Sequence, residues 1–165
     1  MRSLSAIVLV FAVCGMAREA KADDDPPFII GSQPAWILLG GVTTGGTIAL
    51  ADRGALVGGE LSLARLSNSN VLGFYADGYY DWGIDGAYAT GGIELAHKFV
   101  SLDGGAALRF ADGDRDLGVT GRLAFGLGVF SLYGRYMYFT DTMSNEHVIQ
   151  IGVLLKMPLK TFGGM

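Results

Sequence analysis

Short segments in which apolar residues alternate with Gly, Ala, Ser, Thr and isolated charges follow one another from Ala35 to Met157. A period of two places the apolar residues on one face of an extended strand and the small or polar residues on the other. The pattern is clear at 117–128, where Leu117, Val119 and Leu123 share one face while Thr120 and Arg122 share the other. The chain is therefore expected to be all-β, built from strands with one apolar face.

Turn-forming residues divide this region into eight predicted strands. Asp, Asn, Ser and Gly cluster at 51–54, 67–70 and 111–116. The breaks near Phe99 and Val129 are placed by length, because a tilted strand crosses a membrane with about 9 to 11 residues. The predicted strands are 35–50, 55–66, 71–82, 85–98, 100–111, 117–128, 129–140 and 146–157.

The first residues are typical of an export leader. Arg2 precedes the apolar run 4–13, and Ala20-Lys21-Ala22 offers small residues at a cleavage site. Residues 1–22 are therefore predicted to be a cleaved signal peptide, with a cut after Ala17 as the alternative. The apolar run is too short to cross a bilayer as a helix.

The remaining chain is predicted to comprise an acidic, Pro-rich lead-in at 23–34, a barrel at 35–162 and a tail at 163–165. Its sole cysteine, Cys14, lies in the predicted leader, so the exported protein is expected to lack disulfides. The whole chain has a formal net charge of −4. An acidic chain without a basic patch argues against nucleic acid as a partner.

The two faces indicate the surroundings of the barrel. A soluble, lipocalin-like barrel would turn its apolar faces inward and show water a face dense in Lys, Glu and Asp. Here only 17% of the residues are charged, 26 are Gly, and the polar faces are mostly small residues. The sequence therefore favours a closed, antiparallel, up-and-down, eight-stranded transmembrane β-barrel with a narrow lumen. A periplasmic barrel that binds a small apolar ligand is the alternative.

Four of the sparse charges lie in the middle of predicted strands. Glu60 and Asp77 belong to the second and third strands, and Arg122 and Arg135 to the sixth and seventh. These walls face each other across an interior only wide enough for side chains. The four are expected to form an ion-pair cluster that plugs the lumen, in preference to a gated channel. The aromatic residues expected beside them are Tyr75, Tyr79 and Tyr133.

Aromatic residues fall at strand ends on the predicted outer face. Membrane barrels carry Trp and Tyr at the two bilayer interfaces, so these residues are expected to form girdles. Trp36 and Phe130 belong to one girdle, and the other contains Tyr80, Trp82, Phe110, Tyr136 and Tyr138.

The last predicted strand contains a polar, a glycine and two apolar positions at Gln150, Gly152, Leu155 and Met157. This spacing resembles the terminal-strand signal that barrel-assembly machinery recognises. Through this signal and the pattern of eight strands, residues 35–162 resemble the small eight-stranded outer-membrane barrels of Gram-negative bacteria. Many members end on an aromatic residue, whereas here three residues follow Phe162.

The resemblance implies a monomer in the outer membrane, with a structural or surface-interaction role. It implies membrane lipids and lipopolysaccharide as neighbours, and the assembly machinery as a partner during insertion. It also implies chain ends in the periplasm and outward connections near Asp52, Gly83, Asp114 and Asn145. These connections are short, so large extracellular loops that mediate adhesion are not expected.

The two histidines, His97 and His147, fall outward at strand ends, and neither has a Ser or carboxylate at a catalytic spacing. The sequence therefore predicts no catalytic residue, no cofactor and no enzyme. A lipid A-modifying hydrolase, of the kind found among small barrels, is the less favoured alternative.

Asp112, Asp114 and Asp116 alternate like the first half of a calcium loop. Leu117 and Leu123 stand where such a loop needs Gly and Glu. No metal site is therefore predicted, and a solvated hairpin tip is favoured. A weaker hypothesis is that the three carboxylates bridge to lipopolysaccharide phosphates through a divalent cation.

Overall fold

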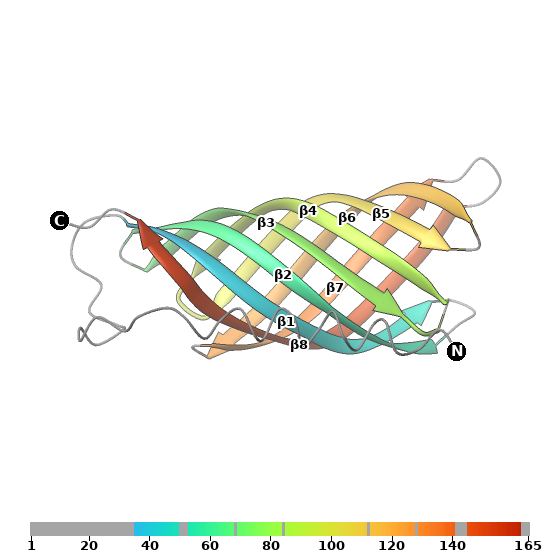
Figure 1. The fold of residues 1–165 in the computed structure, drawn as a ribbon, viewed down its shortest axis with the longest axis horizontal. Coiled ribbons are helices and arrows are strands. Elements are labelled where there is room, and N and C mark those ends of the chain that lie inside the picture. Colours follow the sequence, from blue (N-terminus) through green and yellow to red (C-terminus); the bar gives the residue numbers. More distant parts are fainter. Residues whose placement is uncertain are drawn as a thin grey trace.

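The computed structural model describes residues 35–49, 53–67, 69–83, 85–111, 113–127, 129–140 and 145–162. The predicted signal peptide, the lead-in and the C-terminal tail lie outside the described residues. The described chain forms eight antiparallel strands that pair in sequence order, and the last strand pairs with the first (Figure 1). The prediction of a closed, up-and-down, eight-stranded barrel is confirmed.

The strands are 11 to 18 residues long and are strongly tilted (Figure 1). The end of the barrel where the first strand begins and the last strand finishes is called the terminal end, and the opposite end is called the far end. The strands are β1 Ala35–Ala49, β2 Arg53–Ser67, β3 Asn70–Asp81, β4 Gly86–His97, β5 Val100–Ala111, β6 Asp114–Leu127, β7 Phe130–Thr140 and β8 Asn145–Phe162.

Strand β6 begins at Asp114, three residues before the predicted start at Leu117. Asp116 lies opposite Arg109 in the β5–β6 ladder, and the Arg109 Nε donates a hydrogen bond of 2.8 Å to it. This pair extends the ladder into the acidic segment. Gly113 turns the chain just before it with φ of 89°, a conformation that glycine adopts without steric cost.

Strand β8 continues beyond the predicted end at Met157 because a bulge accommodates the following residues. The β1–β8 register shifts so that Leu39 lies opposite Pro158 while Leu38 lies opposite Lys160, which leaves Leu159 as an extra residue. Proline has no N–H to donate and is tolerated at bulges. The strand then runs on to Phe162.

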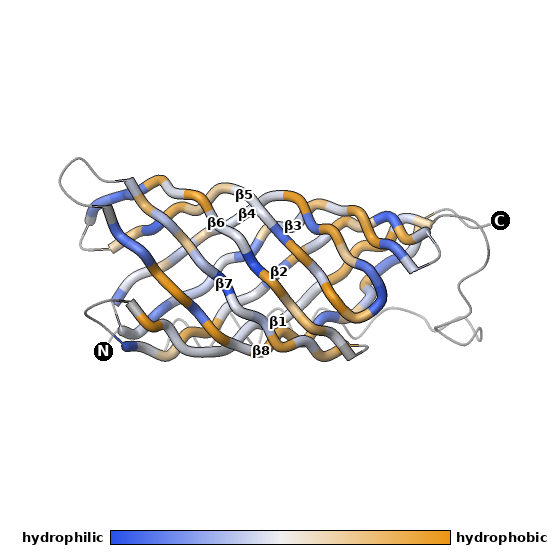
Figure 2. Tube along the Cα trace, turned by 180° about the vertical axis from the view of Figure 1, so that it is seen from behind, coloured by the Kyte–Doolittle hydropathy of each residue, from blue (hydrophilic) through white to orange (hydrophobic). Residues whose placement is uncertain are grey.

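The two faces of the strands alternate as the sequence indicates. In β3, Leu72 and Phe74 are exposed while Tyr75 and Asp77 are buried. Hydropathy along the chain alternates in the same way (Figure 2). The apolar residues face outward and the buried polar residues face the lumen. The structure thus contradicts the alternative of a soluble barrel with apolar faces turned inward around a ligand.

Inward-facing glycines let neighbouring strands coil tightly around the narrow interior. A Cβ on Gly105 would lie 2.0 Å from the backbone oxygen of Gly91, and one on Gly92 would lie 2.0 Å from that of Gly104. No real side chain fits at such distances. Glycine at these two positions is therefore required by the approach of the backbones.

Candidate functional site

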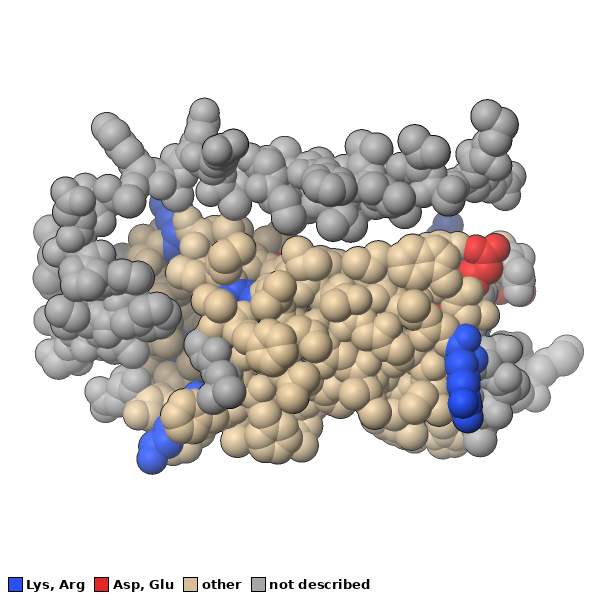
Figure 3. Space-filling view, turned by 90° about the horizontal axis from the view of Figure 1, so that it is seen from below, with Lys and Arg blue, Asp and Glu red and all other residues tan. Residues whose placement is uncertain are grey.

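The outside of the barrel is an apolar belt. Leu117 is 62% exposed and Phe74 is 60% exposed, and large apolar side chains point outward from every strand. Figure 3 shows a broad uncharged surface, with charged side chains gathered mainly towards the two ends. Soluble proteins rarely expose apolar surface on this scale, and it costs free energy in water. In the part of the chain that the structure describes, no helix is long and apolar enough to cross a membrane.

The aromatic residues predicted as girdles all lie on the outer side of the strands. Trp36 and Phe130 lie at the terminal end, and Trp82 and Phe110 lie at the far end. Each of these four is 38% to 52% exposed. The remaining three, which also face outward in the far half of their strands, are Tyr80, Tyr136 and Tyr138.

The structure brings the four predicted lumen charges together in the middle of the barrel. The Arg122 guanidinium pairs with Glu60 and lies 3.7 Å from Asp77, while Arg135 pairs with the same Asp77 carboxylate. Arg122 Nε also donates to Asp103 Oδ2 at 2.5 Å. These five residues, here called the central cluster, are each at most 6% exposed.

The three predicted tyrosines surround the two arginines. The Arg122 guanidinium carbon lies 5.0 Å from the ring centre of Tyr75, and that of Arg135 lies 5.1 Å from the ring centre of Tyr79. Tyr133 lies between them, within 6 Å of both guanidinium carbons, and its hydroxyl accepts a hydrogen bond of 2.9 Å from Thr43. Aromatic faces thus attract the parts of each guanidinium that the carboxylates do not cover.

A lysine extends the central cluster towards the terminal end. Lys156 Nζ lies 2.7 Å from Glu60 Oε1 and 2.8 Å from Glu94 Oε2. Sequence reasoning did not identify Asp103, Glu94 or Lys156 as neighbours of the four predicted charges. The alternation indicates only that both side chains face the lumen, because Lys156 shares a face with Gln150 and Asp103 shares one with Arg109.

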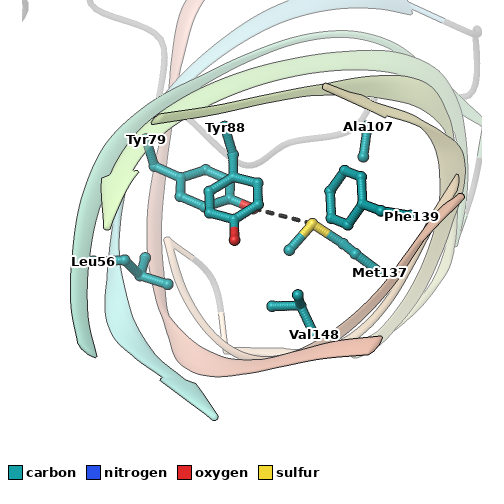
Figure 4. Packing of buried hydrophobic residues seen from close by; sticks show 7 residues of the cluster. All are labelled: Leu56, Tyr79, Tyr88, Ala107, Met137, Phe139 and Val148. Atoms are coloured by element: carbon teal, nitrogen blue, oxygen red, sulfur yellow. Dashed lines mark hydrogen bonds between the residues drawn. The ribbon is translucent and has the colours of Figure 1, made fainter. Parts of the chain in front are cut away.

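An apolar layer crosses the lumen between the central cluster and the far end (Figure 4). The Tyr79 and Tyr88 rings stack with centres 5.1 Å apart, and the Tyr79 hydroxyl donates to the Met137 sulfur at 3.2 Å. Arg135 lies over Tyr79, so the layer begins directly above the central cluster. Its members are Leu56, Tyr79, Tyr88, Ala107, Met137, Phe139 and Val148.

A second set of ion pairs lies at the far end. Arg109 pairs with Glu146 and lies 2.7 Å from Asp116, and its guanidinium carbon lies 5.0 Å from the ring centre of Phe139 in the apolar layer. These three charged residues, the mouth cluster, are more exposed than the central cluster, with side-chain exposures of 13% to 35%. The interior is thus filled by three layers, two ionic and one apolar.

The acidic triplet is not assembled as a cation site. Asp112 lies outside the described residues, Asp114 is exposed, and Asp116 is paired with Arg109. Among the described residues, no group of three or more His, Cys, Asp or Glu side chains is arranged to hold a metal ion.

Both histidines lie on the outside of the barrel. His97 Nδ1 lies 2.7 Å from Asn70 Oδ1, and His147 Nδ1 lies 2.6 Å from the Tyr136 hydroxyl. The His147 ring also packs 5.1 Å from that of Tyr138. The partners of the two rings are thus an amide and phenol groups, rather than the Ser and carboxylate of a hydrolase.

The terminal-strand residues occupy both faces of β8. Gln150 is fully buried and its amide donates to Thr47 at 3.2 Å, while Gly152 also faces the lumen. Leu155 and Met157 face outward and are 46% and 53% exposed.

The barrel is apolar on its outside and holds layers of ion pairs in its lumen, and these two features show what class of protein it is. It is a β-barrel that spans a membrane, because a closed ring of strands pairs every backbone group within the lipid and presents apolar side chains to it.

No family model and no curated protein matches the chain. It is similar to the outer membrane protein Ail of Yersinia pestis in a bilayer nanodisc, with 15% identity over 72% of this chain and 99% of that one and a TM-score of 0.47. It is also similar to Neisserial surface protein A, with 12% identity, coverage of 75% and 97%, and a TM-score of 0.45.

A further similar structure is that of Yersinia pestis Ail in complex with the heparin analogue sucrose octasulfate. The identity is 14%, the coverage is 76% of this chain and 99% of that one, and the TM-score is 0.43. At these identities and scores, the likenesses assign no role to any residue of this chain.

Proposed function

We propose that the protein is a monomeric barrel in the outer membrane of a Gram-negative bacterium, with a plugged lumen and a structural or surface-interaction role. The observation that supports this proposal is that the barrel has an apolar belt on its outside while its own side chains fill its interior. The predicted leader agrees with export to the cell envelope.

The three interior layers favour a plug over a pore. Arg122 and Arg135 are each 2% exposed and project across the middle of the lumen. The apolar layer then separates the central cluster from the mouth cluster, and an ion that crossed this layer would lose its water and meet only the hydroxyls of Tyr79 and Tyr88 as polar partners. An interior of eight strands is only wide enough for such side chains.

The expected partners follow from location. Outer-membrane lipids and lipopolysaccharide would surround the belt, and the assembly machinery would contact β8 through Gln150, Gly152, Leu155 and Met157 during insertion. The amide and phenol partners of His97 and His147 favour a role other than lipid hydrolysis.

Two measurements on the full chain test the proposal. Electrophoresis of protein extracted from outer-membrane fractions should show a shift in mobility on boiling, because closed membrane barrels resist detergent until heated. A planar bilayer containing the folded protein should show no steady single-channel conductance. Recovery in the soluble periplasmic fraction without a shift would refute the membrane location, and regular conductance steps would refute the plug.

A further inference from the structure

A hollow of about 660 Å³ lies in the wall formed by β1 to β4. Its volume falls within the roughly 300–1,000 Å³ typical of ligand pockets. All its lining residues come from these four strands, whereas the lumen is lined from all around the barrel, so the hollow opens on the outer face. The outward-facing residues that line it include Val42, Val57, Gly59, Leu61, Ala76 and Gly78.

The glycines in this hollow are not required by the backbone. Gly59 and Gly78 lie opposite each other in the β2–β3 ladder, and a Cβ on either would meet nothing closer than 3.6 Å and 3.8 Å, respectively. The adjacent, inward-facing Gly58 differs, because its Cβ would lie 2.3 Å from the Gly78 oxygen. The missing side chains at Gly59 and Gly78 therefore leave space on the membrane side, where apolar side chains would otherwise gain burial in lipid.

A positive charge lies in line with the hollow. The outward row of β2 runs from Arg53 through Ala55 and Val57 to Gly59, and Arg53 is exposed at the far end. The girdle residue Trp82 lies beside this row, because its backbone N–H donates to the Ala55 oxygen at 3.0 Å. Trp marks the membrane interface, so Arg53 lies at headgroup level. Gly59 lies about 20 Å further along the strand, within the belt.

We propose that this surface binds one anionic, phosphorylated lipid from the leaflet at the far end. Its phosphate lies at Arg53, which can donate two parallel hydrogen bonds to it, and one acyl chain lies in the hollow over Gly59 and Gly78. The acyl chain recovers the dispersion contacts that the absent side chains do not make. The inference rests on the proposed function, because it requires the belt to face a bilayer.

Charge favours a lipid over a second copy of the chain. In a two-fold pair about the membrane normal, Arg53 of both copies lies at the same level, and the outward row of β2 offers no carboxylate to neutralise it. A lipid phosphate supplies that negative charge.

Native mass spectrometry of the full chain, released from detergent micelles, tests this proposal with two added lipids. Phosphatidylglycerol is the anionic probe, and phosphatidylcholine with the same acyl chains is the zwitterionic control. The wild type should retain one phosphatidylglycerol and bind it more tightly than phosphatidylcholine. Arg53→Ala should remove this preference, whereas Arg115→Ala, an exposed arginine on β6, should keep it.

Filling the hollow tests the acyl-chain position. The double variant Gly59→Leu/Gly78→Leu should bind phosphatidylglycerol about tenfold more weakly, the factor expected for losing the burial of about two methylene groups. Gly59→Ala/Gly78→Ala should weaken binding less. This variant replaces the leucine variant as the test if the leucine variant does not fold. The matched control is Gly121→Leu/Gly134→Leu, since these outward glycines on β6 and β7 also have room for a Cβ.

The heat-dependent gel shift of each preparation is measured first. If the wild type shows no heat-dependent shift, the proposed function itself is overturned. A wild type that shifts but binds the two lipids equally overturns only the lipid site, as does unchanged binding by the alanine and leucine variants of Gly59 and Gly78. A dimer mass that these variants abolish also overturns the lipid site, because the occupant is then a second copy of the chain.

Discussion

Arg122 lies directly across the β5–β6 ladder from Asp103, and its Nε donates to the Asp103 carboxylate while another nitrogen of the same guanidinium pairs with Glu60 on β2. One side chain thus neutralises carboxylates from separate walls of the barrel. Of the other cations nearby, Arg135 is paired with Asp77 and Lys156 bridges Glu60 and Glu94, so neither pairs with Asp103. The stability of the central cluster therefore depends on Arg122.

Replacement of Arg122 by Leu should destabilise the barrel by about 3–5 kcal/mol, because it leaves the buried Asp103 carboxylate without a cation and removes one of the two cations that pair with Glu60. The measurement is the midpoint of urea unfolding in lipid vesicles or micelles. Arg115→Leu is the control, because Arg115 is an exposed arginine on the same strand. An unchanged midpoint for Arg122→Leu would show that the central cluster does not stabilise the fold.

Replacement of Arg109 by Ala should cost less, about 1 kcal/mol, because the mouth cluster is partly exposed and its ion pairs are screened by water. The loss should shrink further as salt is added, whereas that of Arg122→Leu should hardly change. Urea unfolding of both variants at low and high ionic strength checks this contrast. Equal salt dependence would mean that the two clusters are equally accessible to solvent.

Inward and outward glycines should respond oppositely to alanine. Gly105→Ala places a methyl group where the Gly91 oxygen lies 2.0 Å away, so it should destabilise the barrel by about 1–3 kcal/mol or prevent folding. Gly134→Ala meets no atom within 4 Å and should change stability by less than about 0.5 kcal/mol. The yield of heat-shifting protein and the urea midpoint are measured for both. Similar losses would contradict the described strand packing.

Trp36 and Trp82 should both lie at membrane interfaces, at opposite ends of the barrel. In the single-tryptophan variants Trp82→Phe and Trp36→Phe, fluorescence should be quenched more by lipids brominated near the headgroup than by lipids brominated near the chain end. Phe74→Trp in a chain lacking both native tryptophans should show the reverse order, since Phe74 lies deeper in the belt. Deep quenching of either native tryptophan would contradict the girdles.

The alternation in the sequence predicted much of the fold because the period of two is a local property. It identified the eight strands and the lumen face of most of them, including the positions of Glu60 and Arg122, while the faces of the first strand stayed ambiguous. The sequence predicts a start of β6 that is three residues too late, because aspartates at 114 and 116 favour a turn. Their inclusion in the strand depends on Arg109, which lies on the neighbouring strand.

The full membership of the central cluster could not be predicted in this way. Which residues of opposite walls lie at the same level depends on the stagger of the strands around the barrel, and the pattern within one strand carries no information on that stagger. Lys156 was overlooked because its place beside Glu60 and Glu94 depends on how β8 closes against β1.

The extra residue at Leu159 decides on which side of the wall the chain finishes. Every second residue of a regular strand faces the same side, and Gln150 faces the lumen. Without the bulge, Lys160 and Phe162 would therefore also point into the lumen. The bulge inverts this parity, so Phe162 is 42% exposed and lies opposite Trp36, with Lys160 Nζ 5.1 Å from its ring centre. At the terminal end, the seam where the first and last strands meet is therefore closed on its membrane side by two aromatic residues, Trp36 from β1 and Phe162 from β8.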